Sequence, residues 1–423
     1  MPSTIQSGAP SFAEAARFWL RLGFISFGGP AGQIAILHRE VVERRGWLDE
    51  RAFTGALNFC MLLPGPEALQ LAIYLGWKMH GIRGGLVAGL GFIGPAIVLL
   101  LLLSWLYARY GSLPAAEGLL LGLKAAVLAL VLQALLRIGG RALRTPLHVA
   151  LAVGAFVALE FASVPFPLIV LVAALSGLAS AWRAPPAPHP APDASPASAG
   201  APLRVLVTGL VLWALPLAAV ALALGPQSLW SRLYLFFTQA ALVTFGGAYA
   251  VLAYVTQYLV DQLGWVSATQ SVAGLALAET TPGPLVIVLQ FMGFMAGWNQ
   301  PDPLSPTAAA VLAALLASWA TFLPSFVFIF LGAPYVERLT RAPRVAAALA
   351  AVTAAVVGII ATLLVLLARV VLLPEGFAAG LRWPALALAV LLWLALWKSR
   401  LGLHWILLAA AVAGLLLQAT GLA

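Results

Sequence analysis

Apolar stretches recur from one end of this 423-residue chain to the other, with no block of soluble-type sequence between them. Only 9% of the residues are charged and 62% are hydrophobic, whereas a soluble globular chain carries about 25% charged residues. No soluble core could absorb so much apolar surface. A run of roughly 17 to 25 apolar residues crosses a bilayer as a helix. The sequence therefore predicts an all-α polytopic membrane protein.

Two of the apolar regions, residues 12–44 and 52–80, are interrupted by helix-breaking residues. The breaks are the motifs Phe27-Gly28-Gly29 and Pro64-Gly65-Pro66, and Gly and Pro both stop helices. Each flanking piece is about 12 to 17 residues long, which is too short for a full span and favours discontinuous or re-entrant helices. Uninterrupted spans are expected at 83–109, 114–138, 146–161, 165–182, 204–224, 307–333, 343–370, 383–397 and 402–421.

The same breaks return later in the chain at one offset of 218 residues. Phe245-Gly246-Gly247 and Pro282-Gly283-Pro284 repeat the two motifs, and Gly264-Trp265 repeats Gly46-Trp47. Beyond residue 306 the offset becomes 229, so that Pro95 is matched by Pro324. We therefore expect a first repeat over 1–182, a Pro- and Ala-rich linker over 183–203, a connecting transmembrane helix over 204–229 and a second repeat over 230–423.

The basic loops predict that the two repeats are inverted relative to each other. Lys and Arg accumulate in short cytoplasmic loops. The loop after the first break holds Arg39, Arg44, Arg45 and Arg51, whereas its counterpart near Asp261 holds none. The bias reverses at the next pair of loops, where Arg109 stands against Arg338, Arg341 and Arg344. If both broken segments are re-entrant, every charged loop lies on the side that its charge prefers.

Inverted repeats with paired discontinuous helices are typical of secondary transporters, which bind substrate at the repeat interface near the midplane. A helix that starts at Pro66 or Pro284 leaves its first N–H groups unpaired and presents a partial positive charge, which stabilises an anion. Glycine in the break lets a ligand approach the backbone. The alternative is that these motifs are packing kinks. The expected substrate-binding residues are Gly28, Gly29, Gly65, Pro66, Glu67, Gln70, Lys124, Gly246, Gly247, Thr280, Thr281, Gly283 and Pro284.

Ionisable residues within apolar segments are costly and mark function by default. Lys124 could bind or gate an anion, or it could pair with a carboxylate or a carbonyl. Arg21 could act similarly or could extend its side chain to the membrane surface. Glu67 and Glu279 are candidates for proton coupling, because an apolar site favours the protonated carboxyl group. Glu67 could equally cap its helix.

Other function classes find no support in the sequence. Cys60 is the only cysteine and no histidine pair has metal-ligand spacing, so no metal or cofactor is expected. Neither a phosphate-binding loop nor a nucleophile elbow occurs, and an enzyme is not expected. The net charge of +9 is spread between apolar segments, which indicates membrane topology rather than nucleic-acid binding.

At its breaks the sequence resembles the chromate ion transporter family in its long form with two fused halves. The matching stretches cover the amino-terminal core of each half, and they are FISFGGPAG (Phe24 to Gly32), LPGPEALQLAIYLG (Leu63 to Gly76), GIRGGLVAG (Gly81 to Gly89), FGGAYAVLAY (Phe245 to Tyr254) and AETTPGPLVIVLQFMGFMAG (Ala278 to Gly297).

This resemblance implies chromate transport across the bacterial inner membrane, usually as efflux that confers chromate resistance. Chromate and sulfate are both tetrahedral dianions, so helix N-termini together with a cation could bind either one. A transporter of sulfate or another oxyanion, and an anion channel, remain alternatives. The coupling ion and the oligomeric state stay open, with a homodimer as one option.

Overall fold

The computed structural model describes residues 10–182, 200–245, 247–336, 343–376, 378, 380–399 and 401–421. Gly246, Arg338, Arg341 and residues 183–199 of the expected linker lie outside the described residues. The first half of the chain forms α1 (Phe12–Ile25), α2 (Gly29–His38), the π-helix η1 (Arg39–Arg44), α3 (Glu50–Cys60), α4 (Glu67–Tyr110), α5 (Pro114–Ala142), α6 (Pro146–Ala162) and α7 (Phe166–Trp182).

The second half repeats this order of elements after one additional helix, α8 (Gly200–Leu224). It forms α9 (Leu229–Val243), α10 (Ala248–Thr256), the π-helix η2 (Gln257–Gln262), α11 (Ala268–Thr280), the 3-10 turn η3 (Leu285–Ile287), α12 (Val288–Asn299), α13 (Pro306–Gly332), η4 (Ala333–Tyr335), α15 (Pro343–Leu372), α16 (Trp383–Lys398) and α17 (Leu403–Ala419).

Local geometry agrees between the halves at the 218-residue offset. The two π-helices occupy equivalent positions, and Gly46 and Gly264 follow them with φ values of 60° and 61°. In both copies the N–H of the next tryptophan donates at 2.9 Å to a carbonyl of the preceding π-helix, from Trp47 to Val41 and from Trp265 to Leu259. Glycine is required at this turn, because a positive φ disfavours any residue with a β-carbon.

Helix α4 is two helices joined by a reversal at His80 and Gly81, where the backbone is not helical. The two parts fold onto each other, so that a β-carbon on Gly76 would lie 2.4 Å from the carbonyl oxygen of Gly84. In the second half α12 and α13 pack together with a loop between them. The first part of α4, residues 67–79, is therefore a short helix of about 20 Å, against a hydrocarbon core of about 30 Å.

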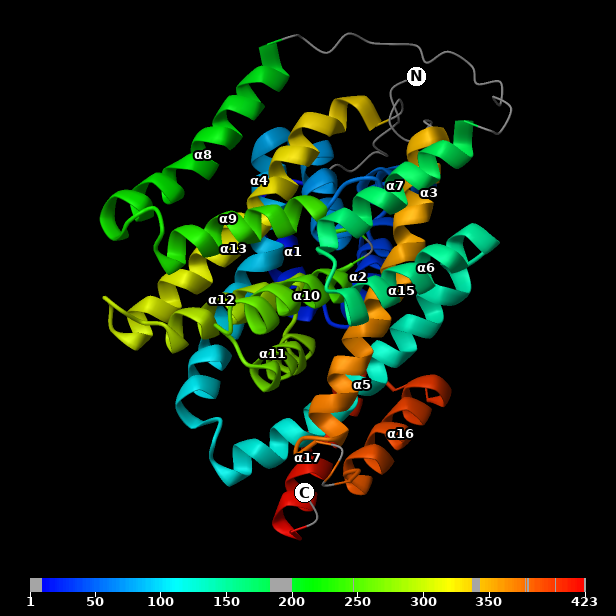
Figure 1. The fold of residues 1–423 in the computed structure, drawn as a ribbon. Coiled ribbons are helices and arrows are strands. Elements are labelled where there is room, and N and C mark those ends of the chain that lie inside the picture. The colour runs from blue at the N-terminus through cyan, green and yellow to red at the C-terminus, as the bar shows by residue number, and fades with distance from the viewer. Residues whose placement is uncertain are drawn as a thin grey trace.

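The distal helices of each half pack against the opposite half. Helices α6 and α7 lie along α15, whereas α16 and α17 lie along α5, as Figure 1 shows. Small residues allow this close approach, since Gly177 of α7 meets Ala347 and Ala351, and Gly122 of α5 meets Ala410. Close backbone packing through small residues is a main source of helix association in membranes. The two halves are therefore intertwined.

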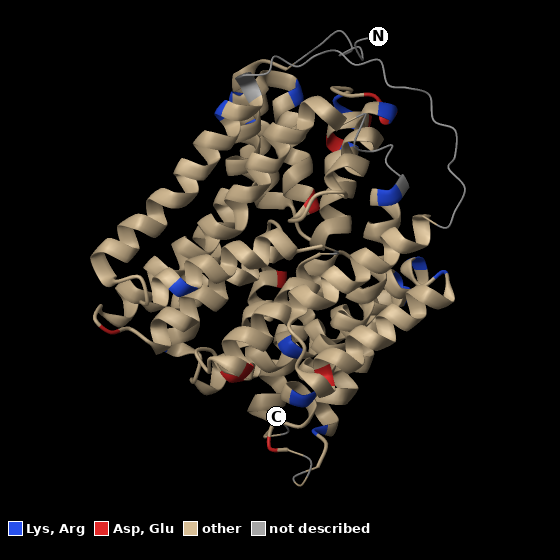
Figure 2. Ribbon diagram, turned by 45° about the horizontal axis from the view of Figure 1, so that its top comes forward, with Lys and Arg blue, Asp and Glu red and all other residues tan. Residues whose placement is uncertain are grey.

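The outer surface is that of a protein embedded in a membrane. Five described helices are long and apolar enough to cross a bilayer, and α8 exposes Leu206, Leu210, Leu215 and Leu222 at the edge of the bundle. Most of the ribbon in Figure 2 carries no charge, and the charged residues gather mainly toward its two ends. The chain is thus a multi-pass membrane protein.

Candidate functional site

Each Pro-Gly-Pro turn contacts the opposite half of the chain. The N–H of Gly65 donates to the carbonyl oxygen of Thr244 at 2.8 Å, and the N–H of Gly283 donates to the carbonyl oxygen of Ser26 at 2.8 Å. Ser26 and Thr244 are equivalent positions directly before the two Phe-Gly-Gly motifs. The four breaks therefore meet as two reciprocal pairs, which bring the ends of short helices from both halves together.

Glycine is needed at the centre of both turns. Gly65 and Gly283 have φ values of 121° and 107°, which side-chain-bearing residues rarely adopt. Space is short as well: a β-carbon on Gly283 would lie 2.6 Å from the β-carbon of Ala96. A β-carbon on Gly65 would lie 2.9 Å from Nε2 of Gln70 and 3.0 Å from Oγ of Ser325. Backbone and side chains thus approach each turn closely.

The Phe-Gly-Gly motifs separate α1 from α2 and α9 from α10. Ser26 and Thr244 follow the last residues of α1 and α9, and their hydroxyls donate to the carbonyls of Leu22 at 2.6 Å and Ala240 at 2.5 Å. The glycines that follow have positive φ values, which are 98° for Gly28, 66° for Gly29 and 99° for Gly247. Two further short helices therefore begin beside the turns.

The helices that follow the two turns begin differently. Glu67 is the first residue of α4, directly after Pro66, and no side chain caps this start. Pro284 is instead followed by the 3-10 turn Leu285–Ile287, and α12 begins only at Val288. Because the first N–H groups of a helix have no intrahelical partner, the start of α4 can bind an anion.

A buried glutamine lies at each turn. Gln70, with no exposed surface, donates from Nε2 to the carbonyl of Pro64 at 2.7 Å. Gln33 donates to the carbonyls of Gly283 and Ser26. Among the described residues neither glutamine has a hydrogen-bond partner for Oε1. Sequence reasoning identified Gln70 but missed Gln33, because only the fold brings residue 33 to residue 283.

Two hydroxyls of α13 were also missed. Thr321 and Ser325 are 2% and 1% exposed, and their oxygens have no hydrogen-bond partner within the described part of the chain. Ser325 is the 229-offset equivalent of Ala96 and directly follows Pro324. A comparison of side chains beside the matched prolines Pro95 and Pro324 could have drawn attention to it.

The residues before the second turn are bound locally. The hydroxyls of Thr280 and Thr281 each donate at 2.7 Å to a carbonyl three residues earlier, in Leu277 and Ala278. Glu279 is 5% exposed and accepts a 2.7 Å hydrogen bond from the hydroxyl of Tyr249 on α10. Of these three side chains, only the carboxyl group of Glu279 contacts another helix through a hydrogen bond.

The two cationic candidates lie elsewhere. Lys124 is partly buried in α5, and its charged neighbours are Arg382, just before α16, and Glu117 on its own helix. Arg21 is exposed on α1. In the described structure neither side chain forms a hydrogen bond or an ion pair with the turns. Lys124 or Arg21 could therefore take part in transport only by approaching the turns or by acting in gating.

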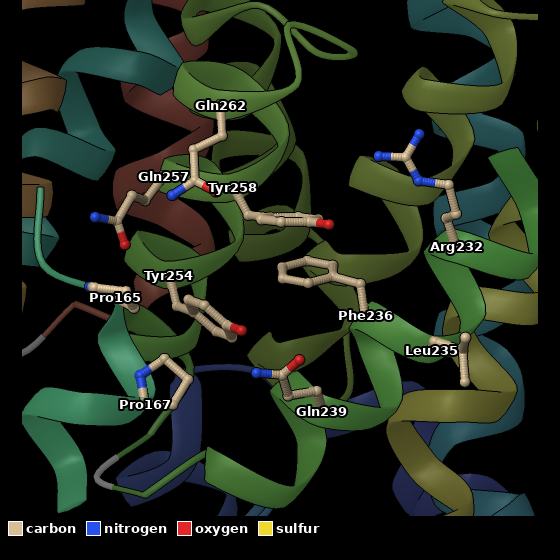
Figure 3. A pocket seen from close by; sticks show the side chains of 10 residues that line it. All are labelled: Pro165, Pro167, Arg232, Leu235, Phe236, Gln239, Tyr254, Gln257, Tyr258 and Gln262. Atoms are coloured by element: carbon tan, nitrogen blue, oxygen red, sulfur yellow. The ribbon is translucent and has the colours of Figure 1, made fainter. Parts of the chain in front are cut away.

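Two cavities of about 370 and 340 Å³ lie on either side of η2 rather than at the turns. Figure 3 shows the larger one, where the rings of Phe236 and Tyr258 stack at 4.1 Å and Arg232 supplies the cation. Gln239, the repeat mate of Arg21, also lines it. Arg232 and Gln239 are exposed, so this cavity is a surface groove.

The described residues contain no cluster of three or more His, Cys, Asp or Glu that could hold a metal ion.

Comparison with known proteins agrees with this architecture. The family model for chromate transporters matches residues 13–178 and 231–415. A chromate transport protein of Pseudomonas aeruginosa is 33% identical over 94% of this chain and 90% of its own length. A second, from Cupriavidus metallidurans, is 29% identical over 87% of each chain, and a probable chromate transport protein of Synechococcus elongatus is 29% identical over 85% of this chain and 86% of its own length.

No solved structure matches the chain. The family model covers the core helices of both halves, including all four breaks, and similarity to the relatives extends over most of their length. This chain therefore belongs to the chromate transporter family.

Proposed function

We propose that the protein is a secondary transporter that moves chromate across the bacterial inner membrane, in the direction of efflux. The observation that carries this proposal is the reciprocal contact of the breaks, from Gly65 to Thr244 and from Gly283 to Ser26. Such a contact joins the starts of short helices from two repeats, and helix starts that face each other bind anions without a full counter-charge. The names of the relatives supply the substrate.

The architecture we propose is a pair of inverted repeats, residues 1–182 and 230–423, with α8 as the connecting helix. In this arrangement the short helices at the four breaks are re-entrant and meet near the midplane. Their lengths support this, because α1, α3, α11 and α12 have 14, 11, 13 and 12 residues, which is short of the roughly 20 that a full span needs. Rocking of one repeat against the other would then expose the site alternately to the two sides.

Glu67 is our candidate for coupling to protons. It stands at the start of α4, where an anion would also be bound. An ionised carboxylate and an oxyanion at one helix start repel each other. Anion binding at this point therefore favours the protonated form of Glu67, so that a proton and the dianion move together. The complex keeps a net negative charge, and efflux by this route is therefore driven by the inside-negative membrane potential and opposed by the inward proton gradient.

The test is uptake of labelled chromate into everted vesicles and into proteoliposomes, with and without an imposed pH gradient. We expect uptake that sulfate competes for and that Lys124→Ala lowers about tenfold or more, since the change removes a cation from an apolar path. The control is Lys398→Ala, which alters an exposed lysine in the last turn of α16. Wild-type protein that moves no chromate above empty liposomes under any gradient would contradict the proposal.

A further inference from the structure

Each Pro-Gly-Pro turn has a buried glutamine, Gln70 at the first and Gln33 at the second, but only the first also lies beside an unpartnered hydroxyl in the described structure. Gly65 lies beside Gln70 and Ser325, whereas the equivalent Gly283 lies beside Ala96. Thr321, one helical turn before Ser325, corresponds to Phe92 in the first half. The two turns thus share their backbone contacts and differ in the side chains that the long helix of the opposite half presents to them.

The hydroxyls of Thr321 and Ser325 are unusual among the buried hydroxyls of this molecule. In a helix, Ser and Thr commonly satisfy their hydroxyl by donating to the carbonyl four residues earlier. This bond is present at Ser26, Ser104, Ser176, Thr238, Thr244, Ser318, Thr353 and Thr362. Thr321 and Ser325 have no partner among the described residues.

An unpartnered polar group in the interior costs free energy, and native structures keep few of them. Here two hydroxyls of α13 and the side-chain oxygen of Gln70 are all buried without a partner, and Ser325 and Gln70 both lie beside the same glycine. The unpaired N–H groups at the start of α4 begin at Glu67, two residues after that glycine. Hydroxyl and N–H donors and one amide-oxygen acceptor, all without a partner among the described residues, thus occur at this turn and on the adjoining turn of α13.

We propose that Thr321 and Ser325, together with Gln70 and the start of α4, form the oxyanion-binding half of the site, and that the turn at Gly283, which has Gln33 but no unpartnered hydroxyl among the described residues, is its structural counterpart. The hydroxyls and the N–H groups donate to the oxygens of a tetrahedral anion. When the bound anion is singly protonated, the side-chain oxygen of Gln70 accepts a hydrogen bond from the hydroxyl group of that anion. This inference rests on the proposed function and names the groups that would select the substrate.

The experiment measures the KM for chromate uptake in proteoliposomes, together with the melting temperature in detergent with and without chromate. Ser325→Ala and Thr321→Val each remove one hydrogen bond to a charged ligand and should raise KM about tenfold or more. Both should lose the rise in melting temperature that chromate produces. Without chromate their melting temperatures should equal or exceed that of the wild type, because an unpartnered buried hydroxyl has been removed.

The matched control is Ser104→Ala, since Ser104 is also fully buried but its hydroxyl is bonded to the carbonyl of Leu100 at 2.6 Å. It should leave KM unchanged. Thr321→Ser keeps the hydroxyl and should keep the wild-type KM even if Thr321→Val folds poorly.

Active wild type with an unchanged KM in both Ser325→Ala and Thr321→Val would overturn this inference and leave chromate transport standing. A change in sodium dependence at constant KM would overturn it too, since the hydroxyls would then hold a cation. Wild type without any uptake would instead contradict the proposed function.

Discussion

The two Pro-Gly-Pro turns have equivalent backbones and different surroundings. Both central glycines have φ values above 100° and donate to the residue before the opposite Phe-Gly-Gly motif. The turn at Gly65 leads directly into α4 and faces Gln70 and Ser325, whereas the turn at Gly283 leads into an apolar 3-10 turn and faces Gln33 and Ala96.

The comparison shows which features both copies of the turn need. The crossed hydrogen bonds need only backbone groups and glycine, so they hold the two halves together whatever the neighbouring side chains are. Ligand groups are needed only once if a single anion is bound. The side chains around the second turn could therefore diverge toward packing.

The largest effect is expected from filling the space at the turns. Gly65→Ala and Gly283→Ala should each cost about 1–3 kcal/mol of stability because of the positive φ. At Gly283 a further cost of about 1–3 kcal/mol is expected, since the new β-carbon would lie 2.6 Å from the β-carbon of Ala96, whereas at Gly65 it meets only terminal side-chain atoms, of Gln70 and Ser325, at 2.9 and 3.0 Å. Melting temperatures in detergent measure the difference. Ala96→Gly should recover part of the loss at Gly283 and none at Gly65, and equal losses would refute this asymmetry.

A second difference between the halves is the bond between Tyr249 and Glu279, whose equivalents in the first half are Ala31 and Met61. Tyr249→Phe should cost about 1–3 kcal/mol, because it removes the donor to a buried carboxyl group. Thermal unfolding measures this loss. The double change Tyr249→Phe with Glu279→Met should restore stability, since both partners become apolar as in the first half. If the double variant is no more stable than the single one, the bond is not the cause.

The smallest effect is expected at the charged surface of the first half. His38 lies 2.6 Å from Glu50 and 3.1 Å from Glu43, and these contacts raise the pKa of His38, chiefly through the hydrogen bond to Glu50. In the second half the equivalent of His38, Thr256, bonds to Ser271 at 2.7 Å, a pair without charge.

A histidine whose pKa is raised in the folded state stabilises the fold at pH values below its unfolded pKa of about 6.5. This stabilisation is lost as the pH rises through the folded-state pKa. The wild-type melting temperature should therefore fall slightly from pH 6 to pH 8. The corresponding loss in the free energy of unfolding should be well under 1 kcal/mol, because Glu50 is largely exposed. His38→Gln should flatten this slope, whereas Thr256→Val should leave it unchanged. A slope that survives in His38→Gln would assign the effect to another group.

Much of the helical architecture could be predicted from the sequence, because its signals are local. The expected spans from 83–109 to 402–421 are helical in the structure, and the breaks at Gly28, Gly65 and Gly283 fall where helices end or begin. Positive φ and proline act within a few residues, so they can be identified without knowledge of the fold. The reversal at Gly81 lies between the expected segments 52–80 and 83–109, but the sequence did not show that the two helices fold back onto each other.

The candidate site could be predicted only in part. Its glycines, Pro66, Glu67 and Gln70 are marked by the breaks themselves. Gln33 and Ser325 lie at the turns through contacts between distant segments, and Thr321 lies one helical turn before Ser325. Nothing in their local sequence distinguishes these three from other polar residues in apolar helices.

By itself the sequence determined that the chain is an all-helical membrane protein with a duplicated set of helix breaks, because hydropathy and backbone restriction are properties of single residues and short segments. Only the tertiary structure decided which break meets which. The exchange of distal helices between halves and the crossed bonds from Gly65 to Thr244 and from Gly283 to Ser26 depend on packing between segments far apart in the chain. That packing also gives one turn, and not the other, a lining of free hydroxyls.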